Sequence, residues 1–171
     1  AGASASDYLK VAEAMNWLEE VWGIELNVSC PNVDHGGMAF GTDVKVLESL
    51  TRAVRNITAK PLIVKLSPNV TDITETARAA EAAGADALSC INSVTGMKID
   101  IRKRRPVIPR GTGGLTGPAI RPVGVAAVWR VTKAVKIPVI GLGGIAGPED
   151  ALEYLLAGAS AIQVGTALFS E

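Results

Sequence analysis

The sequence predicts an α/β fold built on a parallel β-sheet. Short apolar runs alternate along the chain with longer segments in which apolar residues recur every three or four positions. This alternation is typical of βαβ units, in which a helix connects two parallel strands. Several of the short runs end in polar residues or glycine pairs, which is where (β/α)8 barrels place their active sites. We therefore expect a (β/α)8 TIM barrel.

Five segments are expected to form strands, because each is short, rich in β-branched residues and followed by polar or turn-forming residues. They are IELNVS (24–29), PLIVKLS (61–67), DALSCINS (86–93), IPVIGLGG (137–144) and AIQVGTALF (161–169). A closed barrel needs eight strands. We expect an incomplete barrel in which these segments are strands four to eight.

Five segments with helical periodicity are the expected crossover helices. They are DYLKVAEAMNWLEEVW (7–22), DVKVLESLTRAVRNI (43–57), DITETARAAEAAGA (72–85), GVAAVWRVTKAV (124–135) and PEDALEYLLAGA (148–159). Gly84 and Gly158 stand where helix C-caps belong, and Pro148 stands at a first helical position. The first helix has no strand before it, so residues 1–171 are expected to form a single partial barrel domain that is entered midway.

Composition excludes several classes of function. The chain has 17 Lys and Arg against 17 Asp and Glu, so no large basic field predicts a nucleic-acid or acidic-membrane partner. No apolar run approaches the roughly 20 residues of a membrane-spanning helix. The start of the chain lacks the features of a secretory signal, and its two cysteines lack CxxC spacing. A soluble, cytoplasmic protein acting on small molecules, with no metal site, is expected.

The connection from Val94 to Pro118 is unusually long, and long loops are often functional. Within it, MKIDI and PVI flank RKRR, which predicts a small hairpin with a basic tip. A solvated turn and a partner-binding or lid role are both open interpretations.

Polar residues at the end of the first expected strand are candidates for the site. Asn27 and Asn32 can each offer a donor and an acceptor to a planar, amide-rich ligand. Cys30 lies between them in the chain, at the expected barrel mouth. A free cysteine is most often a small buried hydrophobe, but this position favours a catalytic thiol. Cys90, within an apolar strand, is interpreted as structural.

Lys65 lies inside an otherwise apolar strand, where a charge is costly unless it is paired or reaches solvent. An anionic or electron-rich group is therefore expected opposite it. A lysine that extends into water, or one that forms a Schiff base, are the alternatives. On the next strand, Asn92 and Ser93 again place hydrogen-bonding groups at the carboxyl end.

The last two strands end in Gly143-Gly144 and Gly165-Thr166, at loops that in barrels frequently bind phosphate through backbone N–H groups. Glycine lets the backbone approach the anion. The run GLGGIA (141–146) also matches a dinucleotide fingerprint, but the acidic residue expected about 20 positions later is absent. Tight turns alone are the alternative explanation for these glycines.

With these residues assembled, the whole chain resembles the dihydroorotate dehydrogenases, and in particular the NAD-linked class 1B catalytic subunits. The most specific stretch is ELNVSCPNVDHGGMAFGTD, because its HGGMAFG continuation is typical of class 1B. Further matches are VKLSPN, INS at 91–93, GTGGLTGPAI at 111–120, GLGGI and QVGTALF. Several motifs in the same order make a chance match improbable.

The resemblance implies an FMN enzyme of de novo pyrimidine (UMP) biosynthesis that oxidises dihydroorotate to orotate. Cys30 is then the general base that removes the C5 proton while a hydride leaves C6 for the flavin. Asn27, Asn32, Asn92 and Ser93 would hold the substrate, with Asn27 also near the flavin. The other implied flavin contacts are Lys65, Ile91, Gly117, Gly143, Gly144, Gly165 and Thr166.

The resemblance also implies a hetero-oligomer. Class 1B enzymes pass electrons to NAD through a second subunit that carries FAD and a [2Fe-2S] cluster. Three other functions stay open from the residues alone. They are another FMN barrel dehydrogenase acting on a related dihydropyrimidine, a flavin-free lyase or aldolase that uses Lys65, and a non-catalytic barrel fragment.

Overall fold

A computed structural model describes residues 2–28 and 39–169 and places a parallel sheet at their centre. The strands are β1 (Ile24–Asn27), β2 (Leu62–Leu66), β3 (Ala87–Cys90), β8 (Val139–Leu142) and β9 (Ala161–Gln163). They pair in the order β1-β2-β3-β8-β9, which is also their order in the chain. Sequential parallel strands are the topology of a TIM-barrel-type fold, as the sequence predicts.

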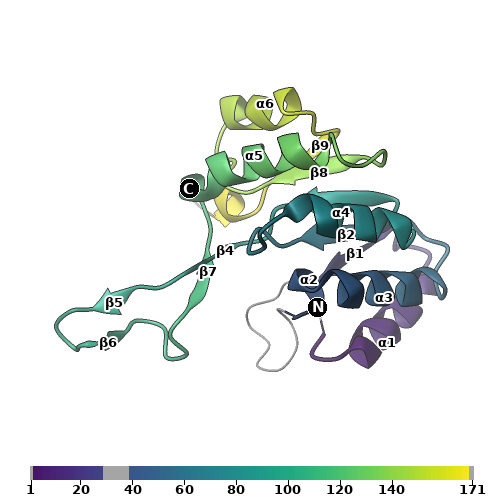
Figure 1. The fold of residues 1–171 in the computed structure, drawn as a ribbon, viewed down its shortest axis with the longest axis horizontal. Coiled ribbons are helices and arrows are strands. Elements are labelled where there is room, and N and C mark those ends of the chain that lie inside the picture. The colour runs from purple at the N-terminus through teal and green to yellow at the C-terminus, as the bar shows by residue number, and fades with distance from the viewer. Residues whose placement is uncertain (1, 29–38, 170–171) are drawn as a thin grey trace.

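The helices follow one another along one side of this sheet (Figure 1). They are α1 (Ala5–Asn16), α3 (Val44–Arg55), α4 (Ile73–Ala82), α5 (Arg121–Val131) and α6 (Pro148–Leu156). Three short elements complete the body, namely α2 (Ala39–Thr42) and the 3-10 turns η1 (Pro118–Ile120) and η2 (Thr166–Phe169). This helix layer covers one face of the sheet, as the helices of TIM-barrel-type folds do.

The two faces of the sheet differ because successive side chains of a strand point in opposite directions. The helix-facing side chains are buried and apolar: Ile24, Leu26, Leu62, Val64, Leu66, Leu88 and Val139. The opposite face carries the polar side chains of Glu25, Asn27, Lys65, Ser89 and Gln163. The apolar core therefore lies between the sheet and the helices, and the polar side chains lie on the opposite face of the sheet.

The predicted helix ends are confirmed at the caps. Asp43 and Asp72 accept backbone N–H groups at the starts of α3 and α4, and Pro148 is the first residue of α6. Gly84 and Gly158 follow the C-caps with φ of +97° and +106°, which is the left-handed region that glycine tolerates.

Two predicted elements extend furthest beyond the ends that the structure shows. The first helix was expected to reach Trp22 but ends at Asn16, because Lys60 Nζ binds the carbonyls of Leu18 and Val21 and holds the following segment as a turn. The last strand was expected to reach residue 169 but ends at Gln163, after which the chain turns into η2.

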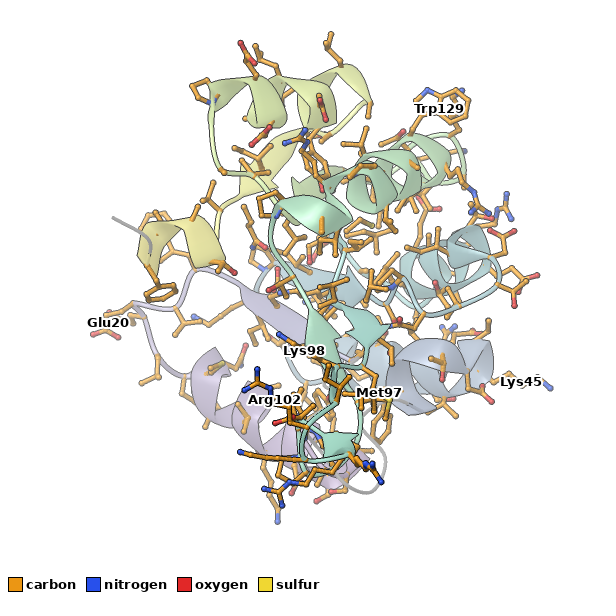
Figure 2. The ribbon with its side chains drawn as sticks, turned by 90° about the vertical axis from the view of Figure 1, so that its left-hand side faces the viewer. Glu20, Lys45, Met97, Lys98, Arg102 and Trp129 are labelled. Atoms are coloured by element: carbon orange, nitrogen blue, oxygen red, sulfur yellow. The ribbon has the colours of Figure 1, made fainter. Side chains whose placement is uncertain are left out.

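The long connection forms a two-stranded arm that projects from the body (Figure 1). β4 (Val94–Gly96) pairs with β7 (Gly113–Leu115), and β5 (Ile99–Asp100) pairs with β6 (Arg105–Pro106). The predicted hairpin with a basic tip is therefore confirmed, and Figure 2 looks toward the arm, with Lys98 and Arg102 labelled on it. The solvated-turn interpretation and the partner-binding or lid interpretation of this arm both stay open.

None of the helices in the described part of the chain is long and apolar enough to cross a membrane.

Candidate functional site

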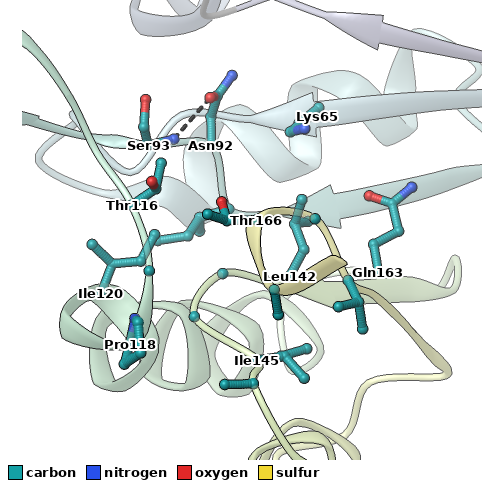
Figure 3. A pocket seen from close by; sticks show the side chains of 18 residues that line it. Lys65, Asn92, Ser93, Thr116, Pro118, Ile120, Leu142, Ile145, Gln163 and Thr166 are labelled. Carbon is teal, nitrogen blue, oxygen red and sulfur yellow. Dashed lines mark hydrogen bonds between the residues drawn. The ribbon is translucent and has the colours of Figure 1, made fainter. Parts of the chain in front are cut away.

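The carboxyl ends of the central strands surround a cavity of about 550 Å³. Its lining comes from residues 91–93, 116–118, 142–146 and 163–167, with Lys65 and Ile120. Figure 3 shows Lys65, Asn92 and Ser93 on one side and Pro118, Ile120 and Ile145 on the other. A cavity of this size, with a few polar groups on an otherwise apolar wall, has the dimensions of a small-molecule site.

Lys65 has the anionic partner that the sequence predicts. Its Nζ lies 3.7 Å from Oε1 of Glu25, and both side chains are largely buried. The other carboxylate oxygen of Glu25 accepts hydrogen bonds from Ser89 Oγ (2.9 Å) and Gln163 Nε2 (3.0 Å). The lysine is therefore held at the cavity wall by a buried network and does not extend freely into water.

Amide side chains form a second polar group beside Lys65. Asn92 Nδ2 donates to Asn27 Oδ1 at 2.8 Å, so Asn27 is tied to the cavity although its own side chain does not line it. Asn92 Oδ1 accepts the N–H of Ser93 at 2.8 Å, which fixes the amide orientation. Asn69 Nδ2 donates to the Ser93 carbonyl at 3.0 Å. These contacts hold Asn27, Asn92 and Ser93 together at the carboxyl ends of the strands.

Glycine loops form the opposite end of the cavity. Gly143 and Gly144 have φ of +123° and +72°, so neither position suits a residue with a side chain. The N–H groups of Gly143, Gly144, Gly165 and Thr166 have no hydrogen-bond partner among the described residues. Unpaired N–H groups on adjoining turns form an anion-binding concavity. This end of the cavity can hold a phosphate.

Gly117 brings a third segment into contact with this end. A Cβ added to Gly144 would lie 2.5 Å from the Gly117 carbonyl oxygen, so the two loops approach closely only because residue 144 is glycine. A Cβ added to Gly117 or Gly165 would meet no protein atom within 4 Å. These two positions face open space that a ligand could fill.

Of the two cysteines, Cys90 lies within the described residues. Cys90 is buried in the core, and burial raises the pKa of its thiol to about 12, so it is a structural residue as the sequence predicts. Cys30 and Asn32 lie outside the described residues.

The sequence analysis missed several residues of the site. Glu25, Ser89 and Gln163 form the network around Lys65, and Thr116 and Ile145 line the cavity. The alternation of Glu25 with Ile24 and Leu26 in β1 is a signal that could have identified it, because a carboxylate on the barrel-interior face needs a partner. Gln163 carries no comparable signal.

The fold and the cavity define a protein of the TIM-barrel type with a small-molecule site at the carboxyl ends of its strands. All 171 residues match the family described as dihydroorotate dehydrogenase. The chain belongs to the dihydroorotate dehydrogenase family.

Curated relatives of the chain carry the name of one type of dihydroorotate dehydrogenase. The chain is 58% identical over 168 residues to a protein of Phocaeicola vulgatus named dihydroorotate dehydrogenase B (NAD(+)), catalytic subunit, covering 98% of this chain and 55% of that protein. The same figures hold for a protein of that name from Geobacter metallireducens. The chain thus spans about half the length of the curated relatives it matches.

A solved structure agrees at the level of fold. The crystal structure of dihydroorotate dehydrogenase from Eimeria tenella, in complex with ferulenol, superposes with a TM-score of 0.78 at 22% sequence identity. The match covers 96% of this chain and 49% of that one.

Proposed function

We propose that this protein oxidises dihydroorotate to orotate in de novo pyrimidine biosynthesis, with FMN as its cofactor. The observation that carries the proposal is a cavity lined by Lys65, Asn92 and Ser93 at one end and by the glycine loops at the other. The chain that forms it is 58% identical to a protein named dihydroorotate dehydrogenase B (NAD(+)), catalytic subunit. Polar recognition of a pyrimidine ring and backbone recognition of a phosphate are the two requirements of such a site.

The cavity fits FMN. The N–H groups of Gly143, Gly144, Gly165 and Thr166, which have no partner within residues 2–28 and 39–169, suit its phosphate. Ile91 and Gly117 can line its ring system. The open space at the Cβ positions of Gly117 and Gly165 leaves room for the cofactor. Lys65 would lie along the flavin ring, where its positive charge favours the reduced, negatively charged form. When bound, FMN supplies the acceptor for the hydride that leaves C6 of dihydroorotate.

The chain's own residues would bind the substrate and move its proton. Asn27, Asn92 and Ser93, together with Asn32, would hold the polar edges of the pyrimidine ring, since amides and hydroxyls both donate and accept. Cys30 would take the proton from C5 as general base. A thiol has an ordinary pKa of about 8.5, so the base must act as thiolate or lose its proton as it receives the substrate's.

The five strands are proposed to be strands four to eight of an eight-stranded barrel, and residues 1–171 to be one partial flavin-binding domain. Two observations support this. The strands pair in chain order with helices on one side only, and the chain spans 55% of its relatives. Closure of the sheet would place the face with Glu25 and Lys65 inside the barrel.

Electrons would leave through a partner. The name "catalytic subunit" carried by the relatives supports a hetero-oligomer. We propose a second subunit with FAD and a [2Fe-2S] cluster, which would reduce NAD. A cytoplasmic location stays a prediction.

Lys65 does not favour the aldolase alternative. Schiff-base formation needs an uncharged lysine amine as the nucleophile, whereas Lys65 lies 3.7 Å from the Glu25 carboxylate in an ion pair. Oxidation of a related dihydropyrimidine stays open, since the described contacts would suit other rings of that class.

An anaerobic absorbance spectrum of the full-length, FMN-loaded protein tests the proposal. Dihydroorotate should bleach the flavin band, and Cys30→Ala should slow this bleaching by about 10²- to 10⁴-fold without loss of the cofactor. The matched control is Cys90→Ala, which removes the other thiol from the core and should leave the bleaching rate unchanged.

Three other results would each reject one part of the proposal, namely the substrate, the cofactor or the base. A flavin band that only another dihydropyrimidine bleaches would keep the flavin barrel and reject the substrate. A folded protein that cannot be loaded with FMN would reject the cofactor. Equal rates of flavin bleaching in Cys30→Ala and in the unaltered protein would reject Cys30 as the general base.

A further inference from the structure

Side chains of α6 form hydrogen bonds with the backbone of the loop that carries Gly143 and Gly144. Tyr154 Oη donates to the carbonyl of Gly143 at 2.7 Å and lies 3.2 Å from that of Leu142. Further along the loop, the Asp150 carboxylate accepts the N–H groups of Ala146 (2.8 Å) and Gly147 (3.1 Å). One helix therefore fixes both ends of the segment that forms the glycine-lined part of the cavity.

Tyr154 is placed so that it can act only through this loop. Its side chain is fully buried, and it is not among the residues that line the cavity. Burial raises the pKa of its hydroxyl to about 12, so the group keeps its proton and stays a donor throughout the neutral range. The hydroxyl has only backbone carbonyls as hydrogen-bond acceptors in the described residues.

Two other glycines make room for this tyrosine. A Cβ on Gly141 of β8 would lie 2.5 Å from the ring atom Cδ1, and a Cβ on Gly124 of α5 would collide with the hydroxyl oxygen. Glycine at these two positions lets the ring pass between strand and helix to reach Gly143. The hydroxyl position is therefore determined by packing as well as by its hydrogen bonds.

The hydrogen bond to Gly143 determines where a neighbouring N–H points. In a trans peptide the carbonyl of residue 143 and the N–H of residue 144 point in opposite directions. Because the Gly143 carbonyl is directed at the buried Tyr154, the Gly144 N–H is directed away from Tyr154, and both glycines line the cavity. That N–H has no partner among the described residues.

We propose that Tyr154 is a positioning residue for cofactor binding, which orients the Gly143–Gly144 peptide so that its N–H donates to the phosphate of FMN. The inference rests on the proposed function and deepens it. It assigns a role to a side chain that touches neither cofactor nor substrate. It also separates recognition of the phosphate from recognition of the flavin ring, because Tyr154 serves only the former.

Comparison of FMN with riboflavin tests this, because riboflavin has the same ring and no phosphate. Affinities are measured by fluorescence titration of the full-length apoprotein. Tyr154→Phe keeps the ring and removes the hydroxyl. We expect FMN affinity to fall about five- to tenfold, the value of roughly one hydrogen bond, while riboflavin affinity stays within about twofold.

Tyr8→Phe is the matched control. Tyr8 is also buried, and its hydroxyl donates to a strand carbonyl, that of Asn27, at 2.7 Å. Tyr8→Phe removes a buried hydroxyl that binds the end of β1, and Tyr8 is not among the residues that line the cavity. The ratio of FMN to riboflavin affinity should therefore not change in this variant.

A second measurement needs no variant. In wild-type protein labelled with ¹⁵N-glycine, the Gly144 amide resonance should move when FMN is added and should not move with riboflavin. A Gly144 amide that ignores FMN overturns the inference, as does Tyr154→Phe with both affinities unchanged or equally lowered. Wild-type protein that does not prefer FMN to riboflavin instead overturns the phosphate site of the proposed function, and this inference with it.

Discussion

At the scale of single residues, the polar wall of the cavity depends on Glu25. Its carboxylate is shared by a cation and two neutral donors from β2, β3 and β9, namely Lys65, Ser89 and Gln163. A largely buried ion pair with additional hydrogen bonds loses little by its burial, whereas a single buried charge is costly. Glu25 thus allows a lysine to stand at the cavity wall, and it also lowers the positive potential there.

Glu25→Gln should therefore make the reduction potential of bound FMN more positive. Without the carboxylate, the Lys65 charge would act unopposed on the flavin of the proposed site and would stabilise its negatively charged reduced form. A shift on the order of 30 mV corresponds to about 1.4 kcal/mol for a two-electron couple. The measurement is an equilibrium titration against a redox dye.

Ser89→Ala is the control for this prediction, because it removes one hydrogen bond to Glu25 and keeps the charge. Its potential should change much less. A Glu25→Gln potential equal to or below that of the wild type would contradict the electrostatic role of Glu25.

At the scale of elements, α6 combines a predicted helix start with a function for the loop before it. Pro148 occupies the first turn, where its missing N–H costs nothing, and Asp150 accepts the N–H groups of Ala146 and Gly147. Arg121 at the start of α5 pairs with Asp150 and Glu153. The capping interactions of α6 therefore also connect two of the segments that line the cavity.

The stability of the protein should depend on pH through Asp150. The hydrogen bond from Ala146 N–H is the main cause that holds the pKa of Asp150 below its ordinary value of 3.8, and Arg121 adds to it. A carboxyl with a lowered folded-state pKa contributes stability above pH 3.8 and loses it as the pH falls below that value. Wild-type protein should thus lose more stability between about pH 6 and pH 3 than Asp150→Asn does.

Urea unfolding at the two pH values measures this difference. Glu149→Gln is the control, because it removes the other carboxylate of the same helical turn. Identical pH dependence in Asp150→Asn and wild type would show that Asp150 contributes no proton-linked stability.

At the scale of the whole molecule, the sheet in the described residues is open. Its outer strands are β1 and β9, and an unpaired parallel edge presents free N–H and C=O groups. Large apolar side chains near the β9 side are exposed, with Phe169 at 89% and Leu156 at 87%. Both features agree with the proposal that further strands and a helix complete the barrel.

Residues 1–171 expressed alone should therefore self-associate, because the open sheet edges and exposed apolar side chains of the described residues can pair with a second copy. Sedimentation velocity over a range of concentrations should show reversible or irreversible assembly. The full-length protein should lack the dye-binding apolar surface of the fragment. A monomeric fragment that binds no apolar dye would contradict the barrel-completion proposal.

The sequence by itself determined the local structure and the type of site. Periodicity of apolar residues located the strands and helices, and Gly84, Gly158 and Pro148 marked helix ends because caps and φ angles depend on a few adjacent residues. Polar residues at strand ends pointed to Lys65, Asn92 and the glycine pairs, since the carboxyl ends of parallel strands meet at one edge.

Only the tertiary structure decided which residues act together. Gln163 meets Glu25 across 138 positions of sequence, and Lys60 ends the first helix from another element. Tyr154 resembles any apolar helix residue in the sequence, yet its hydroxyl holds the Gly143 carbonyl. Such pairings depend on strand order and packing, which place distant residues in contact and which no local pattern of residues encodes.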